Sequence, residues 1–335
     1  MERFRAPALW PRRGHASVRA TMTSRHAIAA AALRLSPHLR HTPVLRLAGA
    51  DLGLAGAAAE LALKLELLQH TGSFKPRGAF NRLLEAGAAA GSAGVIAASG
   101  GNHGAAVAFA ARALGLAAEI FVPAATPQAK LARIASYGAR VVPGGASYAE
   151  ALAACRARQA ETGALEVHAY DDAAVIAGQG TAGREFAQDA PDLTHILVAV
   201  GGGGLIGGIA AWYAGAAEVI GVEPEGCPTL HAARAAGRPV AVPTGGLAAD
   251  SLGARELGAL VWPIAAAHVA ASVLVPDTAI RAAQRLLWDR LRLIAEPGGA
   301  VALAALVCGA FTPPEGARVG VLVCGGNTDP AEVPR

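Results

Sequence analysis

The amino-acid sequence predicts an α/β fold in which mainly parallel sheets are flanked by helices. Strand-like and helix-like runs alternate along the 335 residues, for example in Ala118 to Val122, Pro127 to Tyr137 and Arg140 to Val142. Two glycine-rich turns, at residues 99–104 and 201–204, each follow an apolar run, as is typical of a strand that leads into a helix. A chain of this length can bury a large core in one or two domains.

The composition indicates an ordinary soluble enzyme. Hydrophobic residues make up 53% of the chain, largely because alanine is abundant. The formal net charge is only +4, so we expect neither a nucleic acid nor a membrane as partner. The four cysteines show no paired spacing, which favours a reducing cytoplasm: Cys155, Cys227, Cys308 and Cys324.

Basic residues gather in residues 1–25, which we expect to form a disordered tail. The alternative is that Met22, and not Met1, is the true start. A nucleic-acid-binding arm fits less well, because only Phe4 and Trp10 interleave the arginines.

Lys75 is the most informative residue of the chain. It lies among small and apolar neighbours in the run 70–79, just before a predicted helix from Ala79 to Ala90. Desolvation lowers the pKa of a lysine, and the neutral amine is a nucleophile that can form a Schiff base with a carbonyl cofactor. A single lysine is more often a solvated surface charge, so the interpretation depends on two further motifs.

The second motif is the turn from Ser99 to Gly104. It follows the apolar run 95–98 and precedes the alanine-rich stretch 105–113, so it predicts a strand-to-helix turn. The free N–H groups of such a helix N-terminus bind anions, and glycine lets a carboxylate approach the backbone. An ordinary turn capped by Ser99 or Asn102 is the alternative, but Asn102 and His103 together exceed what a cap requires.

The third motif is the run of glycines from Gly201 to Gly204, which Leu205 follows. It separates a strand-like run, 196–200, from a helix-like run, 206–217. Four glycines are unfavourable in backbone entropy, and a backbone cradle for a phosphate would explain them. The uncharged stretch 196–217 is long enough for a membrane helix, but the glycines in its middle argue against one.

The same region also fits a nicotinamide-binding protein. Gly202, Gly204 and Gly207 match the G-x-G-x-x-G pattern, and Glu223 closes the next strand-like run. This alternative leaves the Lys75 motif and the Ser99 turn unexplained, so it ranks second.

The three motifs, in this order, resemble the pyridoxal-phosphate enzymes of the tryptophan-synthase-β fold type (fold type II), and among these the threonine/serine dehydratases. The resemblance runs from about Arg25 to the end of the chain. Five further segments contribute to it: residues 41–44, 178–181, 221–226, 296–300 and 324–327.

The resemblance implies a role for each motif. Lys75 would bind the cofactor pyridoxal 5'-phosphate as a Schiff base and act as the base at Cα, with Phe74 beside the ring and Cys324 at the pyridine nitrogen. The substrate carboxylate would bind to Ser99, Gly100, Gly101, Asn102 and His103, with Asn102 also contacting the cofactor. The phosphate would be wrapped by Gly201, Gly202, Gly203, Gly204 and Leu205.

The implied reaction is β-elimination from L-threonine or L-serine, which gives ammonia and a 2-oxo acid. Racemisation is the alternative at the same cofactor, but related racemases usually carry a second serine where this chain has Gly100. The chain also ends soon after residues 324–327, so we expect no feedback by isoleucine at a regulatory domain.

The resemblance also implies two lobes and a homodimer. A small lobe, 94–171, would be inserted into a large lobe made of 26–93 and 172–335. Some relatives bind a divalent cation through a glutamate and an aspartate. Glu223 matches the glutamate, but Thr229 stands where the aspartate is expected. Glu223 is therefore only a weak metal candidate, and we expect no metal and a structural or surface role for it.

Overall fold

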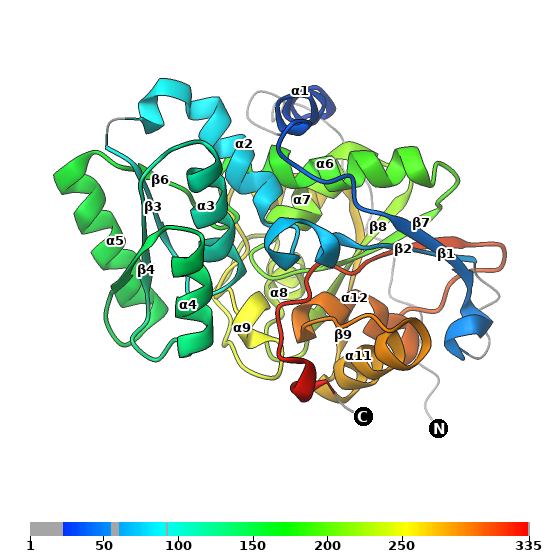
Figure 1. The fold of residues 1–335 in the computed structure, drawn as a ribbon. Helices are drawn as coiled ribbons and strands as arrows, with labels where there is room; N and C mark the ends of the chain where they lie inside the picture. The colour runs from blue at the N-terminus through cyan, green and yellow to red at the C-terminus, as the bar shows by residue number, and fades with distance from the viewer. Residues whose placement is uncertain (1–22, 55–59, 92, 334–335) are drawn as a thin grey trace.

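The computed structural model describes residues 23–54, 60–91 and 93–333, which form two sheets with helices around them (Figure 1). The expected tail lies almost entirely outside the described residues, as does Met22. Arg25, which the sequence analysis assigned to this tail, instead begins helix α1. Its guanidinium donates to the carbonyl oxygen of Tyr213 at 2.9 Å, so this residue is part of the folded protein.

The larger sheet has six strands in the order β1-β2-β10-β7-β8-β9. Strand β1 runs antiparallel to β2, and the other neighbours are parallel. The strands are β1 (Val44–Ala48), β2 (Glu60–Lys64), β7 (His195–Ala199), β8 (Glu218–Pro224), β9 (Val269–Val275) and β10 (Arg318–Leu322). The predicted α/β fold with mainly parallel strands is therefore confirmed.

The smaller sheet has four parallel strands in the order β5-β4-β3-β6. They are β3 (Val95–Ala98), β4 (Ala118–Val122), β5 (Arg140–Pro143) and β6 (Leu165–Glu166), and the helices between them are α3 (Asn102–Ala113), α4 (Gln128–Ser136) and α5 (Tyr148–Thr162). All of these elements fall within the segment predicted as the small lobe. The assignment of this segment as a domain stays a prediction.

Helices cover both faces of the six-stranded sheet (Figure 1). One group lies above it in this view: α1 (Arg25–Leu35), α2 (Pro76–Ala86), α6 (Ala173–Asp189) and α7 (Gly204–Tyr213). The other helices are α8 (Thr229–Ala236), α9 (Ala249–Leu252), α10 (Val261–His268), α11 (Asp277–Leu291) and α12 (Pro297–Val307). Short 3₁₀ segments are η1 (Gly49–Leu52), η2 (Glu66–Leu68), η3 (His70–Gly72), η4 (Gly87–Ala90) and η5 (Pro330–Glu332).

Three helices begin earlier than expected from the sequence, and one of them is α3, which starts at Asn102 rather than Ala105. Helix α2 starts at Pro76, because proline fits the first helical position, where its missing N–H is not needed. It ends before Gly87, whose φ of +51° breaks the helix. Helix α7 starts within the glycine run, at Gly204, and ends before Ala214 in the left-handed conformation.

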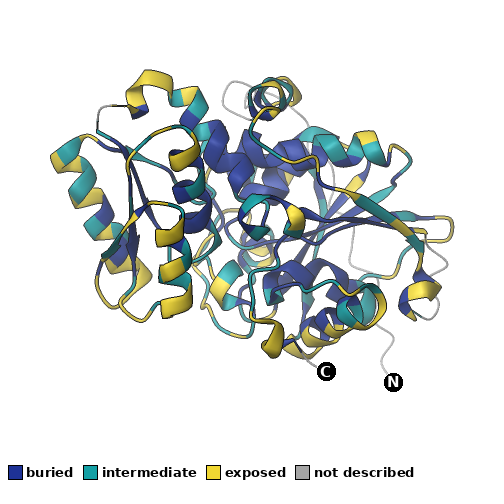
Figure 2. Cartoon of the chain, in the orientation of Figure 1, coloured by how far each residue is buried: buried dark blue, intermediate teal, exposed yellow. Residues whose placement is uncertain are grey.

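The main core lies between the six-stranded sheet and its helices, where α7 and α12 are almost wholly buried (Figure 2), and it extends to β3, β4 and α3. The four-stranded sheet has a second, much smaller cluster, which we call the small-sheet cluster: Ile96, Ala98, Phe121, Cys155 and Ala164. All four cysteines are free thiols. Within the described ranges, no helix is both long and apolar enough to cross a membrane.

Candidate active site

Lys75 ends an irregular segment between the six-stranded sheet and α2. The backbone N–H of Phe74 donates to the carbonyl oxygen of Cys324 at 3.1 Å, which ties this segment to the end of β10. The Lys75 Nζ donates to the carbonyl oxygen of Ala169 at 2.9 Å and lies 5.1 Å from the centre of the Phe74 ring. Burial lowers the pKa of the Lys75 amine to about 8. The neutral, nucleophilic amine is therefore populated close to neutral pH.

A buried ionic network fixes the backbone next to Lys75. Arg77 donates to both carboxylate oxygens of Glu66, at 2.7 and 2.8 Å, and to both oxygens of Glu185 at 2.8 Å. Lys64 donates to Glu185 at 3.1 Å, and we call these four residues the Arg77 network. The side chains of Arg77 and Glu66 are 0% exposed. Since Arg77 is in the first turn of α2, the network holds the start of this helix in place.

The turn predicted to bind a carboxylate lies between β3 and α3. Ser99 Oγ accepts a hydrogen bond from the backbone N–H of Gly101 at 3.2 Å. Asn102 is the first residue of α3, so the N–H groups of the first helical turn have no helical carbonyl to donate to. These N–H groups and the helix dipole favour an anion at this position.

His103 anchors this turn rather than exchanging protons. Its Nε2 donates to the carbonyl oxygen of Val167 at 2.8 Å, so the other ring nitrogen carries no proton in the neutral form. Burial lowers the pKa of His103 to about 3, which keeps the imidazole neutral at physiological pH.

Gly100 has no room for a side chain. A Cβ at this position would lie 2.7 Å from Thr126 Oγ1 and 2.8 Å from Thr126 Cγ2. The Thr126 hydroxyl is itself held by the carbonyl oxygen of Pro123 at 2.7 Å. A serine at position 100 would therefore have to displace a fixed neighbour.

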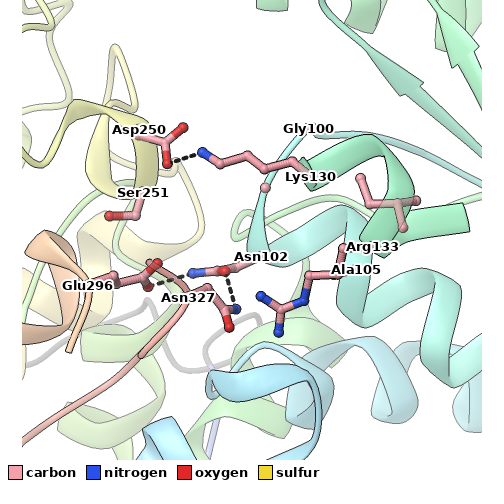
Figure 3. A pocket seen from close by; sticks show the side chains of 11 residues that line it. Gly100, Asn102, Ala105, Lys130, Arg133, Asp250, Ser251, Glu296 and Asn327 are labelled. Carbon is pink, nitrogen blue, oxygen red and sulfur yellow. Dashed lines mark hydrogen bonds and ion pairs between the residues drawn. The ribbon is translucent and has the colours of Figure 1, made fainter. Parts of the chain in front are cut away.

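Asn102 joins the two sheets through a hydrogen-bonded trio (Figure 3). Its side-chain nitrogen donates to Glu296 Oε1 at 2.6 Å, and its side-chain oxygen accepts from Asn327 Nδ2 at 2.6 Å. Asn327 also donates to the carbonyl oxygen of Thr71 at 2.8 Å. Burial raises the pKa of Glu296 to about 7. The amide of Asn102 is therefore fixed in orientation by partners from the large sheet.

The glycine run forms the turn between β7 and α7. Gly203 has φ of +92° and is the N-cap of α7, a conformation that favours glycine. A Cβ on Gly202 would lie 2.3 Å from the ring of Tyr170. Leu205 is buried, with 5% exposure. The run therefore presents bare backbone at a helix N-terminus, which can bind a phosphate.

Cys324 lies just beyond the end of β10 and is buried. Its Sγ donates to the carbonyl oxygen of Gly298 at 3.4 Å. Burial raises the pKa of the thiol, so Cys324 is uncharged at physiological pH.

Glu223 lies on β8 and is enclosed by hydrogen-bond donors. Its side chain is 0% exposed and accepts hydrogen bonds from the backbone of Leu230 at 2.7 Å, of His231 at 2.8 Å and from Ser272 Oγ at 2.7 Å. A dinucleotide ribose would need this carboxylate at an open strand end, so the geometry disfavours the nicotinamide alternative.

The structure brings the three motifs together, and it adds residues that the motifs did not assign. Glu296, which acts on the pKa of Lys75, and Asn327 belong to segments of the family resemblance, which was their only signal. Tyr170, which packs on Gly202, had no signal in the sequence. Lys130 and Arg133, two cations that line a cavity beside Asn102, also had no signal in the sequence.

These groups fit pyridoxal phosphate. Lys75 offers a neutral amine to its aldehyde, and the start of α7 offers backbone N–H groups to its phosphate. Two buried hydroxyls near Lys75, Thr71 Oγ1 and Ser73 Oγ, have no hydrogen-bond partner within the part of the chain that the structure describes. A polar molecule bound beside them would complete their hydrogen bonding.

Comparison with known proteins identifies the family. A family model described as pyridoxal-phosphate dependent enzyme matches residues 35–325. The chain is 43% identical over 269 residues to an L-threonine ammonia-lyase of Geobacter sulfurreducens, covering 79% of this chain and 67% of that protein. It is 37% identical to a phenylserine dehydratase of Ralstonia pickettii, covering 94% of this chain and 96% of the relative.

A solved structure shares the fold of this chain. The structure of maize serine racemase matches with a TM-score of 0.87 and 33% identity, and the match covers 92% of this chain and 95% of the racemase. The predicted tryptophan-synthase-β-like fold is therefore confirmed, and so is the predicted cofactor. The sequence, the fold and the groups around Lys75 agree, and this chain belongs to the family of pyridoxal-phosphate dependent enzymes.

Proposed function

We propose that this chain is a dehydratase that converts L-threonine, L-serine or both into ammonia and a 2-oxo acid. The product is 2-oxobutanoate from threonine and pyruvate from serine. The position of Lys75 carries the proposal, because burial lowers the pKa of its amine to about 8 beside the anion-binding turn. The amine lies close enough to this turn to act on the pKa of His103. The ammonia-lyase and the dehydratase named above support the type of reaction.

Each residue of the site has a role in this proposal. Lys75 holds the cofactor and then removes the proton from Cα, and Phe74 packs beside the ring. When bound, pyridoxal phosphate withdraws electrons from Cα and makes this proton acidic. The phosphate is bound by Gly201, Gly202, Gly203, Gly204 and Leu205. The substrate carboxylate is bound by Ser99, Gly100, Gly101, Asn102 and His103.

Cys324 suits elimination better than a carboxylate would at the same place. In the proposal its thiol lies against the ring nitrogen, and burial keeps it uncharged. An uncharged partner leaves the ring a weaker electron sink than a carboxylate would. Such a site favours a reaction in which the β-substituent leaves at once and removes the charge from Cα.

Racemisation is the second candidate, because the maize serine racemase shares the fold. The crowding at Gly100 disfavours it. A second base would have to act on the opposite face of Cα, and Thr126 occupies the space that a serine side chain at position 100 would need. We therefore place elimination first.

The decisive experiment follows absorbance and product in one cuvette. The purified protein, with pyridoxal phosphate added, receives L-threonine or L-serine while 2-oxo acid is measured. We expect the cofactor band to shift and 2-oxo acid to accumulate. Lys75→Ala removes both effects, whereas Arg140→Ala, a change of an exposed cation on β5, serves as the control. A band shift without 2-oxo acid contradicts the dehydratase proposal, and D-serine as the product establishes racemisation.

We also propose a cytoplasmic homodimer with two mobile lobes. Four free thiols support a reducing compartment. The small lobe is 94–171, and its movement toward the large lobe when substrate binds would bring the substrate carboxylate to the cofactor ring. Light scattering of the purified protein tests the dimer, because a monomer mass contradicts it.

A further inference from the structure

A small cavity with several charged and polar side chains on its lining lies between the predicted carboxylate turn and helix α4 (Figure 3). Gly100 to Asn102 form one side, and Lys130 and Arg133 reach it from α4. Ser251 and Glu296 line it from the large-sheet part of the chain. Lys75 is not among the lining residues. The cavity nevertheless adjoins the reacting centre, because the Glu296 backbone N–H donates to the carbonyl oxygen of Gly325 at 3.1 Å, and the neighbouring Cys324 accepts from Phe74, the residue before Lys75, at 3.1 Å.

The two cations of this cavity differ in how they are paired. The Lys130 ammonium forms an ion pair with Asp250. The Arg133 guanidinium donates to the carbonyl oxygen of Thr71 at 2.7 Å. Among the described residues, no carboxylate lies within ion-pair distance of Arg133. A guanidinium carries five N–H donors, so Arg133 keeps donors for a bound anion.

The neighbours of Arg133 hold its guanidinium in a fixed place. Thr71 and Gly72 have φ of +57° and +69°, and this turn presents the Thr71 carbonyl to the guanidinium. A Cβ on Gly72 would lie 3.3 Å from Arg133 Nη2, so the guanidinium packs directly on the turn. A fixed guanidinium recognises a carboxylate well, because little side-chain freedom is lost on binding.

The α-carboxylate of an amino acid does not require this arginine. The backbone N–H groups at the start of α3 already form an anion site on the other side of the cavity. Glu296 is the acidic group that senses Arg133. Its pKa is raised to about 7 by burial, so it carries only part of a charge at neutral pH. Arg133 is thus a surplus positive charge in the substrate cavity.

We propose that Arg133 binds a second anionic group on the substrate, so that the preferred substrate is 3-hydroxyaspartate. The inference rests on the proposed dehydratase function and names its substrate class. The Cα–H and Cβ–OH bonds break and water leaves. Water then adds back as the nitrogen is released, so 3-hydroxyaspartate gives one oxaloacetate and one ammonia. The carboxylate on Cβ is unchanged in the reaction and stays available to Arg133.

The test is a selectivity ratio measured by ammonia release. We expect kcat/KM for 3-hydroxyaspartate, with each diastereomer assayed separately, to exceed kcat/KM for L-serine at least tenfold for one diastereomer. Arg133→Ala should lower this ratio at least tenfold, and Arg133→Lys should lower it less. Because both substrates use the same enzyme sample, partial misfolding of a variant cancels in the ratio.

Arg112→Ala is the matched control. Arg112 also donates to a backbone carbonyl, that of Ser136 at 3.1 Å, but it does not line the cavity. The selectivity ratio of Arg112→Ala should equal that of the wild type.

A second readout is binding of L-aspartate and L-alanine, which lack a leaving group, to the holoenzyme by thermal shift. The wild type should bind L-aspartate more tightly than L-alanine, and Arg133→Ala should remove this preference.

Three outcomes overturn the inference. Wild-type protein that prefers serine or threonine to both diastereomers excludes it while leaving the dehydratase proposal intact. Equal losses for all substrates in Arg133→Ala show that Arg133 only joins α4 to the Thr71 turn. An absence of turnover with every substrate, combined with no preference for L-aspartate in binding, removes both proposals. A preference for L-aspartate in binding without any turnover supports the Arg133 site but not the dehydratase.

Discussion

The side-chain nitrogen of Asn102 donates a hydrogen bond of 2.6 Å to Glu296, although 194 positions separate the two residues. Asn102 starts helix α3 beside the four-stranded sheet, and Glu296 precedes α12 on the six-stranded sheet. Burial raises the pKa of Glu296 to about 7. The charge at the junction of the two sheets therefore changes near neutral pH, and it acts on Lys75.

Glu296→Gln should make the Lys75 amine neutral at lower pH. The Glu296 carboxylate raises the pKa of Lys75, so its removal lowers that pKa further below about 8. The measurement is the rate at which cofactor-free protein binds pyridoxal phosphate, followed by absorbance from pH 6 to pH 10. The midpoint of this profile should move to lower pH. Glu85→Gln, a half-exposed carboxyl on α2, should leave it in place, and a shift to higher pH in Glu296→Gln would contradict the argument.

Lys75 should make the unfolding free energy of the cofactor-free protein increase with pH in the alkaline range. Burial lowers the pKa of Lys75 from 10.5 to about 8 in the folded state. Between these values the unfolded chain binds more protons, so stability rises with pH across this window. Lys75→Met lacks this contribution. The unfolding free energy of the wild type, minus that of Lys75→Met, should increase from pH 7.5 to pH 10, and a flat difference would exclude a buried amine.

Gly203→Ala should weaken cofactor binding at least tenfold. Gly203 and Gly215 have nearly the same φ, +92° and +89°, so alanine strains the backbone by about 1–2 kcal/mol at either position. A Cβ on Gly203 would also lie 2.6 Å from Leu257 and 2.7 Å from Val261, whereas Gly215 faces open space. Gly215→Ala therefore measures strain alone in titrations with pyridoxal phosphate. Equal affinities in the two variants would remove Gly203 from the phosphate site.

Gly100→Ser should lower dehydratase activity without creating a racemase. The new side chain would collide with Thr126, whose nearest atom lies 2.7 Å from the added Cβ, and it would push the carboxylate turn out of position. Gly100→Ser combined with Thr126→Ala removes the collision and should recover activity. Chiral analysis of serine, alongside 2-oxo acid release, follows both reactions. Activity in Gly100→Ser equal to that of the wild type would show that the turn tolerates a side chain.

Arg77→Met should destabilise the protein by about 3–5 kcal/mol, because it leaves buried carboxylates without their partner. Glu66 loses both of its hydrogen bonds from Arg77. The double variant Arg77→Met with Glu66→Gln should recover part of this loss. Denaturant unfolding of the wild type, the single variant and the double variant measures these differences in unfolding free energy. A single variant within 1 kcal/mol of the wild type would show that the network contributes little.

Much of the fold and site follows from local sequence patterns. Lys75 is visible because it is a lysine among small and apolar neighbours. The Ser99 turn and the glycine run are visible because small residues at a strand end leave backbone N–H groups free, and the structure places all three motifs around one site. The boundaries were less accurate, since Pro76 and Gly204 start their helices inside motifs that the sequence analysis treated as loops.

Other features depend on the tertiary structure and leave no local pattern. Arg133 looks like any surface arginine of an amphipathic helix, and only its contact with Thr71, 62 positions away, places it in the cavity. Tyr170 likewise gains its role from packing on Gly202. The pKa of Glu296 is raised by burial, which no sequence window reveals.

The Arg77 network has a consequence for how this protein would lose activity on heating. The penalty for desolvating ions falls as temperature rises, so the anchor beside Lys75 becomes relatively stronger in a warm protein. The four-stranded sheet contributes residues such as Ala97 and Ile120 to the main core, and its own separate apolar core is only the small-sheet cluster. Thermal inactivation should therefore begin with loss of the substrate turn, while Lys75 still retains its cofactor.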